Sequence, residues 1–209
     1  MAHIGAWVSI KMAGGVGGIW SGGRGGDLRV QSWNCNSLKK KQKSWMQFIS
    51  KLKNSSENVF ILVDTRFGPQ QEKEFEKLWD GPIFFNSYNT NQRGIMILFR
   101  DSLPVKNVVV ENRLKGDFTR LSLIWGSKKV LIKCCYAPNE DSPALDSENE
   151  NYSCEFFRDI FDDSHDSDYD IIMMAGDFNV APDPNKDTLE YLHINNPNSR
   201  HFIERMKAL

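Results

Sequence analysis

Residues 170–179 read D-I-I-M-M-A-G-D-F-N, an apolar run that ends in a carboxylate and an amide, Asp177 and Asn179. A short and continuous apolar run predicts a strand buried on both faces, here over Asp170–Ala175. The strand is expected to end in the segment Gly176-Asp177-Phe178-Asn179, in which the glycine is a turn signal. We therefore expect Asp177 to lie at the C-terminal end of a core strand.

Three other apolar segments also end in polar side chains. They are Leu28–Trp33 before Asn34 and Asn36, Val59–Val63 before Asp64, and Val130–Tyr136, which ends in Tyr136 and is followed by Asn139. Sheets of α/β proteins bind ligands at the C-terminal ends of their strands, so these groups are expected to share one site. Carboxylates suit a hard cation, and amides and a phenol suit phosphate oxygens, so the set favours phosphate-ester cleavage.

Each of these polar groups also has a purely structural interpretation. Asn34 and Asn36 would serve as turn residues that bond the backbone after a strand. Tyr136 would be a core tyrosine with a satisfied hydroxyl, and Asp177 would cap a helix or turn. From the residues alone, both interpretations stay open.

The remaining pattern predicts helices and further strands. Helices are expected from a Ser37 cap to Leu52, over Gln70–Trp79, over Tyr152–Phe161 and from Ser199, with strands at Ile83–Phe85, Gly94–Phe99, Val105–Val110 and Phe118–Trp125. Strand–helix–strand units thus flank a run of consecutive strands. This order predicts a mixed α/β domain with two sheets inside and helices outside.

The first 27 residues differ from the rest because glycine dominates 14–26. Ordering so many glycines costs much backbone entropy, so residues 1–27 are expected to be a flexible, dispensable leader before a domain at 28–209. A phosphate-binding glycine loop is a weaker alternative, since GxxxxGK[ST] is absent. No apolar run approaches a membrane span. The four cysteines form no CxxC pair and favour reduced, buried thiols, which suits the nucleus or cytosol.

The net charge of −1 conceals two regions of opposite sign. Residues 28–139 hold 19 Lys and Arg against 9 Asp and Glu, whereas residues 140–170 hold 12 acidic residues against Arg158. A basic body suits a phosphate-backbone partner such as DNA, although surface lysines also simply keep a protein in solution. The acidic stretch lacks the spacing of a calcium loop and is read as a solvated loop and helix face.

The segments WNCNS, LVDTR, RGIMILF, CCYAPN and AGDFN, in this order, resemble the endonuclease/exonuclease/phosphatase superfamily. The likeness is closest to the apurinic-type endonucleases of LINE-type retrotransposons and runs from about Leu28 to the C-terminus. It implies a deoxyribonuclease-I-like fold, a four-layer sandwich of two mixed sheets flanked by helices. It also implies a Mg²⁺- or Mn²⁺-dependent nuclease that nicks DNA and leaves a 3′-hydroxyl, with no obligate protein partner evident.

The resemblance also implies a role for each site residue. Asn34 would orient the metal-binding carboxylate and the phosphate, and Asn36 lies where several relatives carry Asp. Asp64 takes the metal-ligand position, usually Glu, so its oxygens fall about 1–1.5 Å short unless the backbone shifts. Mg²⁺ bound through water would bridge that gap.

The remaining roles concern the scissile phosphate. Tyr136 would bond the phosphate, Asn139 would support its loop, and Asn179 would hold a phosphate oxygen. Asp177 would position or deprotonate the attacking water, or protonate the leaving group.

One expected motif is absent. The family continues to a Ser-Asp-His motif that supplies the acid/base histidine, whereas 30 residues follow Asn179 here without it. The sequence therefore predicts an incomplete C-terminal part and keeps an inactive retroelement remnant as the alternative to an endonuclease. A phosphatase or RNA nuclease of the same fold is disfavoured by the motifs. His165, His193 and His201 are not read as catalytic.

Overall fold

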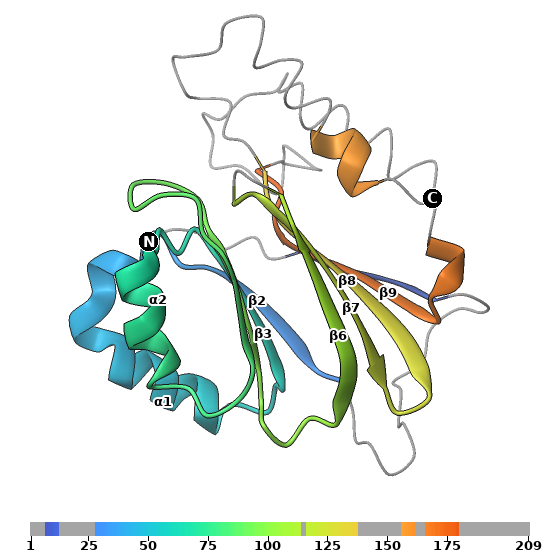
Figure 1. Cartoon of the computed structure of the whole chain (residues 1–209), viewed down its shortest axis with the longest axis horizontal. Helices are drawn as coiled ribbons and strands as arrows, with labels where there is room; N and C mark the ends of the chain where they lie inside the picture. The colour runs from blue at the N-terminus through green and yellow to red at the C-terminus, as the bar shows by residue number, and fades with distance from the viewer. Residues whose placement is uncertain (1–6, 13–27, 114–115, 138–155, 162–165, 180–209) are drawn as a thin grey trace, which may run out of the picture. The chain divides into compact units, whose positions relative to one another are not determined.

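The computed structural model describes residues 7–12, 28–113, 116–137, 156–161 and 166–179 (Figure 1). The chain divides into two compact units, Met1–Tyr136 with His165–Asp177, and Ala137–Ser164 with Phe178–Leu209. The first unit holds both sheets and the longer helices. In the second unit, residues 156–160 form a short helix whose Phe156, Phe157 and Ile160 are buried.

The first unit contains a four-stranded mixed sheet. Its order is β2 (Val30–Asn34), β3 (Val59–Val63), β5 (Ile95–Phe99) and β4 (Ile83–Asn86). β2 and β3 pair parallel, and the other neighbours pair antiparallel. The parallel pair is connected through the helix that follows β2, as a parallel connection requires.

The second sheet of the first unit has five strands. Its order is β1 (Trp7–Met12), β9 (Ile171–Asp177), β8 (Lys128–Tyr136), β7 (Phe118–Trp125) and β6 (Val105–Asn112). β8 and β9 pair parallel, whereas the other neighbours pair antiparallel. Each sheet therefore contains one parallel pair, and these pairs carry the four strand ends singled out in the sequence.

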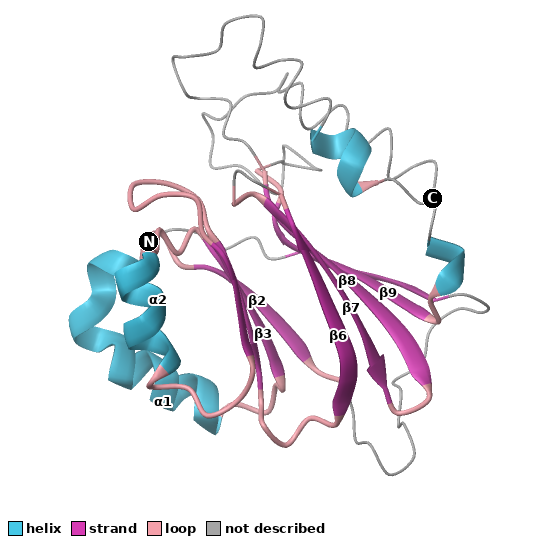
Figure 2. Ribbon diagram, viewed as in Figure 1, coloured by secondary structure: helices cyan, strands magenta, loops and turns pink. Residues whose placement is uncertain are grey.

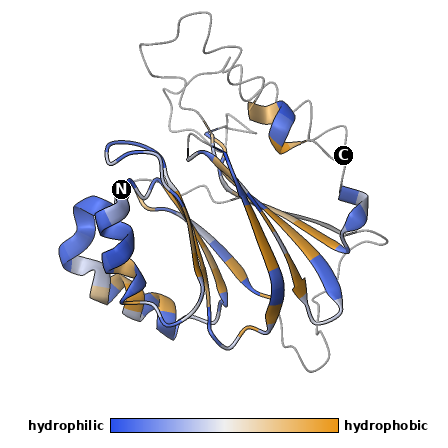
Figure 3. Cartoon of the chain, viewed as in Figure 1, coloured by the Kyte–Doolittle hydropathy of each residue, from blue (hydrophilic) through white to orange (hydrophobic). Residues whose placement is uncertain are grey.

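The apolar core lies on both faces of the four-stranded sheet, and β3 shows the reason. Its side chains alternate, with Val59, Ile61 and Val63 packed in a cluster with residues of the five-stranded sheet and Phe60 and Leu62 in a cluster with the helices. All five are fully buried, so the strand reads as one unbroken apolar run. Figure 3 shows the same apolar colouring along the strands of both sheets.

Helices cover the outer face of the four-stranded sheet (Figure 2). They are a 3-10 segment at Leu38–Ser44, α1 at Trp45–Asn54 and α2 at Pro69–Glu76. The prediction that Ser37 caps a helix is wrong, because Ser37 has φ 66° and its side chain makes no capping hydrogen bond. The tighter 3-10 segment that follows replaces the first turns of the expected helix.

The predicted α/β sandwich of two mixed sheets is confirmed. The apolar runs at Val59–Val63 and Phe118–Trp125 are strands with the expected bounds. The helix expected from Ser199 lies outside the described residues. Cys35, Cys134 and Cys135 are free and buried, as expected. None of the helices in the described part of the chain has the length and apolarity that a bilayer crossing requires.

The structure differs from expectation at the start of the chain. Residues Trp7–Met12 form β1, which pairs antiparallel with β9 from Trp7 opposite Gly176 to Met12 opposite Ile171. The sequence signal was weak because the apolar stretch here is short and is broken by Lys11. β1 forms the edge of the five-stranded sheet, so it covers the backbone groups of β9 that would otherwise form that edge. The domain boundary at residue 28 stays a prediction.

We therefore expect removal of residues 1–27 to lower the thermal unfolding midpoint by several degrees, measured by circular dichroism. The deletion removes the β1–β9 ladder, and each 1 kcal/mol lost shifts the midpoint by about 2–4 °C in a chain of this size. The control removes only residues 1–5, which precede β1. An unchanged midpoint in the longer deletion would instead support the dispensable leader that the sequence predicts.

Candidate active site

The two parallel strand pairs bring four predicted site residues to the ends of the sheets. In the four-stranded sheet Asn34 lies opposite Val63, the residue before Asp64. In the five-stranded sheet Tyr136 lies opposite Asp177. Parallel strands end at the same edge of a sheet, so each pair presents two polar side chains together.

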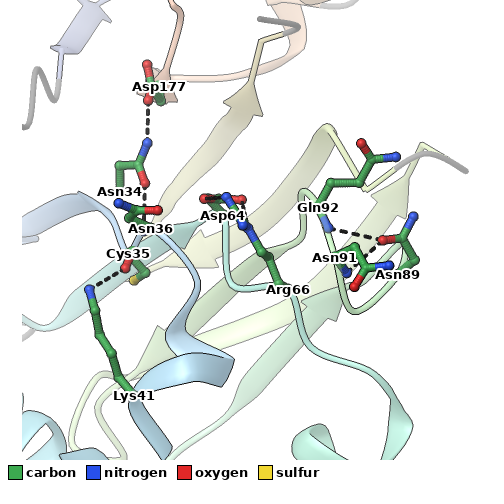
Figure 4. Close-up of polar contacts among 10 residues, drawn as sticks. All are labelled: Asn34, Cys35, Asn36, Lys41, Asp64, Arg66, Asn89, Asn91, Gln92 and Asp177. Carbon is green, nitrogen blue, oxygen red and sulfur yellow. Dashed lines mark hydrogen bonds and ion pairs between the residues drawn. The ribbon is translucent and has the colours of Figure 1, made fainter. Parts of the chain in front are cut away.

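A hydrogen bond joins the two sheets at this edge. The Asn34 side-chain Nδ2 donates to Asp177 Oδ2 at 2.5 Å (Figure 4). The other side of the same amide, Asn34 Oδ1, accepts the backbone N–H of Asn36 at 2.9 Å. Asn34 thus contacts both the turn after β2 and the Asp177 carboxylate, and the role that the resemblance implies for it stays a prediction. Asn36 is exposed, and its backbone N–H makes this contact.

Asp64 is buried and forms an ion pair with Arg66, two residues further on. The Arg66 Nε and Nη2 donate to the two Asp64 carboxylate oxygens at 2.9 and 2.8 Å (Figure 4). The Asp64 residue is 3% exposed, whereas the Arg66 side chain is 23% exposed. The bond to Asp64 raises the pKa of Arg66 above its usual value, so the guanidinium stays charged.

The loops that carry these groups hold several strained backbone conformations. Asn36, Ser37, Asp64 and Arg66 all have positive φ angles, between 43° and 66°. Non-glycine residues adopt this region rarely, and such residues gather at functional sites. In this chain they mark the two turns that follow the parallel pair β2 and β3.

Tyr136 lies between charges of both signs. Burial and the nearby carboxylates of Asp64 and Asp177 raise its pKa to about 12, and Arg66 and Arg93 oppose the shift. The phenol is therefore neutral at physiological pH and keeps its O–H donor. The Tyr136 backbone N–H also donates to the Asp117 carbonyl at 2.8 Å, which fixes the end of β8.

Glycine is required in the Ala-Gly-Asp segment at the end of β9. Gly176 has φ 139°, and a Cβ at this position would lie 1.9 Å from the Cys135 carbonyl oxygen. Only glycine lets β9 approach β8 this closely in that conformation. The residue therefore sets the position of Asp177 beside Tyr136.

Two further predicted site residues, Asn139 and Asn179, lie outside the first compact unit. Asn179 belongs to the second compact unit, where its Nδ2 donates to the Ala137 carbonyl at 2.6 Å. Asn139 lies outside the described residues. The roles that the resemblance implies for both residues stay predictions.

The sequence reasoning missed Arg66 and Arg93 as site residues. Arg66 stands inside the quoted LVDTR segment, and its spacing from Asp64 was the available signal. Arg93 has φ 63°, forms an ion pair with the buried Asp117 at 3.4 Å and lies over the Tyr88 ring. No sequence pattern placed it near Tyr136, because the turn from 89 to 93 read only as a polar loop.

The described side chains do not fit a directly coordinated divalent cation. Mg²⁺ takes oxygen ligands, commonly one or two carboxylates with water. Asp64 has both oxygens on Arg66, and Asn36 supplies an amide where an Asp would add charge. Within the described ranges no group of three or more His, Cys, Asp or Glu side chains is placed to hold a metal ion.

We expect the stability of the protein to fall as the pH rises from about 10 to about 12, in part through Tyr136. Its pKa in the folded state is about 12 against 10 when unfolded, so unfolding releases a proton in this window. Tyr136→Phe should flatten that part of the curve of unfolding free energy against pH, measured by urea titration. The buried thiols contribute to the same fall, so the comparison is between the variant and the wild type. Identical curves would contradict the assignment.

Comparisons with known proteins bear on the fold. No family model matches the chain, and no curated protein matches its sequence. Among solved structures, the chain is similar to the catalytic domain of Xenopus laevis APE2, with a TM-score of 0.67, 12% identity and coverage of 84% of this chain and 66% of that one. The chain is also similar to the AP endonuclease LMAP from Leishmania major, with a TM-score of 0.57 and 15% identity. That match covers 86% of this chain and 66% of the other.

A third structure is a 3′ phosphatase, NExo from Neisseria bound to a product DNA hairpin. It gives a TM-score of 0.59 and 17% identity, and the match covers 86% of this chain and 70% of that one. The chain thus spans about two thirds of the length of these proteins. At such low identity the likeness concerns the fold alone, and it agrees with the two mixed sheets. The chain is therefore an α/β sandwich of the deoxyribonuclease-I-like type.

Proposed function

We propose that the chain carries the phosphodiester site of a DNA endonuclease of the retrotransposon type, which nicks DNA and leaves a 3′-hydroxyl. The observation that carries the proposal is the Asn34–Asp177 hydrogen bond, with Tyr136 in register beside Asp177. A carboxylate, an amide and a neutral phenol held together by two sheets suit the attack of water on a phosphate ester.

Each residue has a role that its geometry supports. Asp177, oriented by Asn34, would position or deprotonate the attacking water, or protonate the leaving group. Tyr136 would donate its O–H to a phosphate oxygen, because its raised pKa keeps the proton in place. Arg66 and Arg93 would supply positive charge next to the phenol. Asn139 and Asn179 would complete the phosphate contacts, as the resemblance implies.

The partner in this proposal is DNA, contacted through its phosphate backbone. The excess of basic over acidic residues in 28–139 favours such a partner, and one of the similar structures holds a DNA hairpin. A nuclear site of action would follow. Mg²⁺ or Mn²⁺, which the resemblance implies, enters no step here because the described donors do not fit it.

A second candidate is a domain that binds DNA without cleaving it. The Asp64–Arg66 ion pair favours this candidate, because it neutralises the carboxylate that stands in the family's metal-ligand position. It corresponds to the inactive alternative that was stated together with the resemblance.

The test is conversion of supercoiled plasmid to open circle, in Mg²⁺ and in EDTA, with DNA binding followed in parallel by fluorescence anisotropy. For an endonuclease, Asp177→Ala should slow nicking by about 10²–10⁴, the usual effect of losing a general acid or base. Asp168→Ala, at an exposed position, is the matched control and should nick as the wild type does.

The outcomes separate the candidates. Nicking that is equal in the wild type and Asp177→Ala would come from a contaminant and contradict the endonuclease. DNA binding without nicking would support the second candidate. If the chain neither bound nor nicked DNA, both candidate functions would be contradicted.

A further inference from the structure

Arg66 occupies the carboxylate that would otherwise be available to a cation. Its two N–H groups reach the two Asp64 oxygens at 2.9 and 2.8 Å, one donor to each oxygen. This paired geometry matches a guanidinium to a carboxylate better than any single-point contact. A metal ion at Asp64 would have to displace one of these bonds or use the remaining lone pairs of the two oxygens, directly beside the guanidinium charge.

The backbone holds the pair in this arrangement. On one side Ser37 and Lys39 donate their N–H groups to the carbonyls of Asp64 and Thr65, at 2.8 and 3.1 Å. On the other side Thr65 and Arg66 donate to the carbonyls of Gly94 and Arg93, at 3.2 and 2.9 Å. The turn is therefore fixed between two loops, and the positive φ angles of Asp64 and Arg66 are part of its shape.

Gly94 shows how tightly the turn is enclosed. It has φ 102°, and a Cβ there would lie 2.6 Å from the Thr65 hydroxyl oxygen. A side chain at 94 would push the turn away from β5. The turn that carries Asp64 and Arg66 is thus closely enclosed by the neighbouring loop.

Charge and burial explain why the ion pair matters for cation binding. A carboxylate that is 3% exposed needs a compensating charge, and Arg66 already provides it. Asn36 adds no charge at this end of the site. A divalent cation approaching Asp64 would therefore meet an ion pair without net charge, whose guanidinium repels it, in place of a free carboxylate.

We propose that Arg66 acts as a resident cation at Asp64, so that Mg²⁺ or Mn²⁺ binds there only in competition with the guanidinium. The remaining N–H groups of Arg66, next to Tyr136, then present positive charge to a phosphate oxygen without a metal ion. This inference rests on the proposed function in one respect: it takes Asp64 as the residue at which a cation would bind. It does not require that the chain cleave DNA.

The test is Mn²⁺ binding to the full chain, measured from the electron paramagnetic resonance signal of free Mn²⁺. Asp64→Asn serves as the baseline, because the acidic stretch at 140–170 is unchanged in it and its background binding can be subtracted. We expect no Asp64-dependent binding in the wild type at micromolar Mn²⁺. Arg66→Gln should bind Mn²⁺ at least about tenfold more tightly than the wild type does. The reason is that Asp64 loses its charged hydrogen-bonded partner and is free to bind the ion.

Two further variants make the result decisive. Arg66→Lys keeps the charge but loses the paired geometry, so its affinity should lie between those of the wild type and Arg66→Gln, and it replaces that variant if circular dichroism shows Arg66→Gln unfolded. The double variant Asp64→Asn with Arg66→Gln should lose the gain. Tight, Asp64-dependent binding by the wild type, or no gain on removing the guanidinium, would overturn the proposal. Neither result depends on nicking, so a failure of the proposed function would be recognised separately.

Discussion

The hydrogen bond from Asn34 to Asp177 is the constraint on which the site depends, because it joins the ends of two different sheets. Each sheet delivers one polar pair through one parallel ladder, β2 with β3 and β8 with β9. Parallel ladders end together, so the alignment within each sheet follows from topology. The alignment between the sheets depends on this side-chain contact and on the apolar layer that packs them together.

Two carboxylates and two guanidinium groups act in opposite directions on the neutral phenol of Tyr136. Asp64 and Asp177 raise the pKa of Tyr136, while Arg66 and Arg93 oppose them. The arginines come from loops that carry strained backbone angles, at Arg66 and Arg93 themselves. Such loops hold charged groups close together without a helix or strand beneath them, and the surrounding sheets hold the loops in place. The sheets therefore position Asn34, Tyr136 and Asp177 at the ends of their strands, whereas the loops position the two arginines.

Most strands of this fold could be predicted from the sequence, and particular residues show why other features could not. The run Val59–Val63 is apolar throughout because both faces of β3 are covered. The sequence therefore predicted this strand correctly. β1 was not predicted because its apolar stretch is short and is interrupted by Lys11, and because its partner β9 lies far away in the sequence. Asn34 and Asp177 were expected at strand ends because polar residues follow apolar runs there, and both lie at the ends of strands. Arg66 was missed because a partner for Asp64 in a turn depends on backbone angles that a linear pattern does not encode.

The distance along the chain between Asn34 and Asp177, 143 positions, has a consequence for biosynthesis. Contacts between distant segments form late, because the loop between them must close first. A growing chain that has left the ribosome only as far as β8 holds Asn34, Asp64 and Tyr136 but lacks Asp177. The site therefore cannot assemble until β9 has emerged and joined the sheet, so assembly of this constellation reports that both sheets are complete.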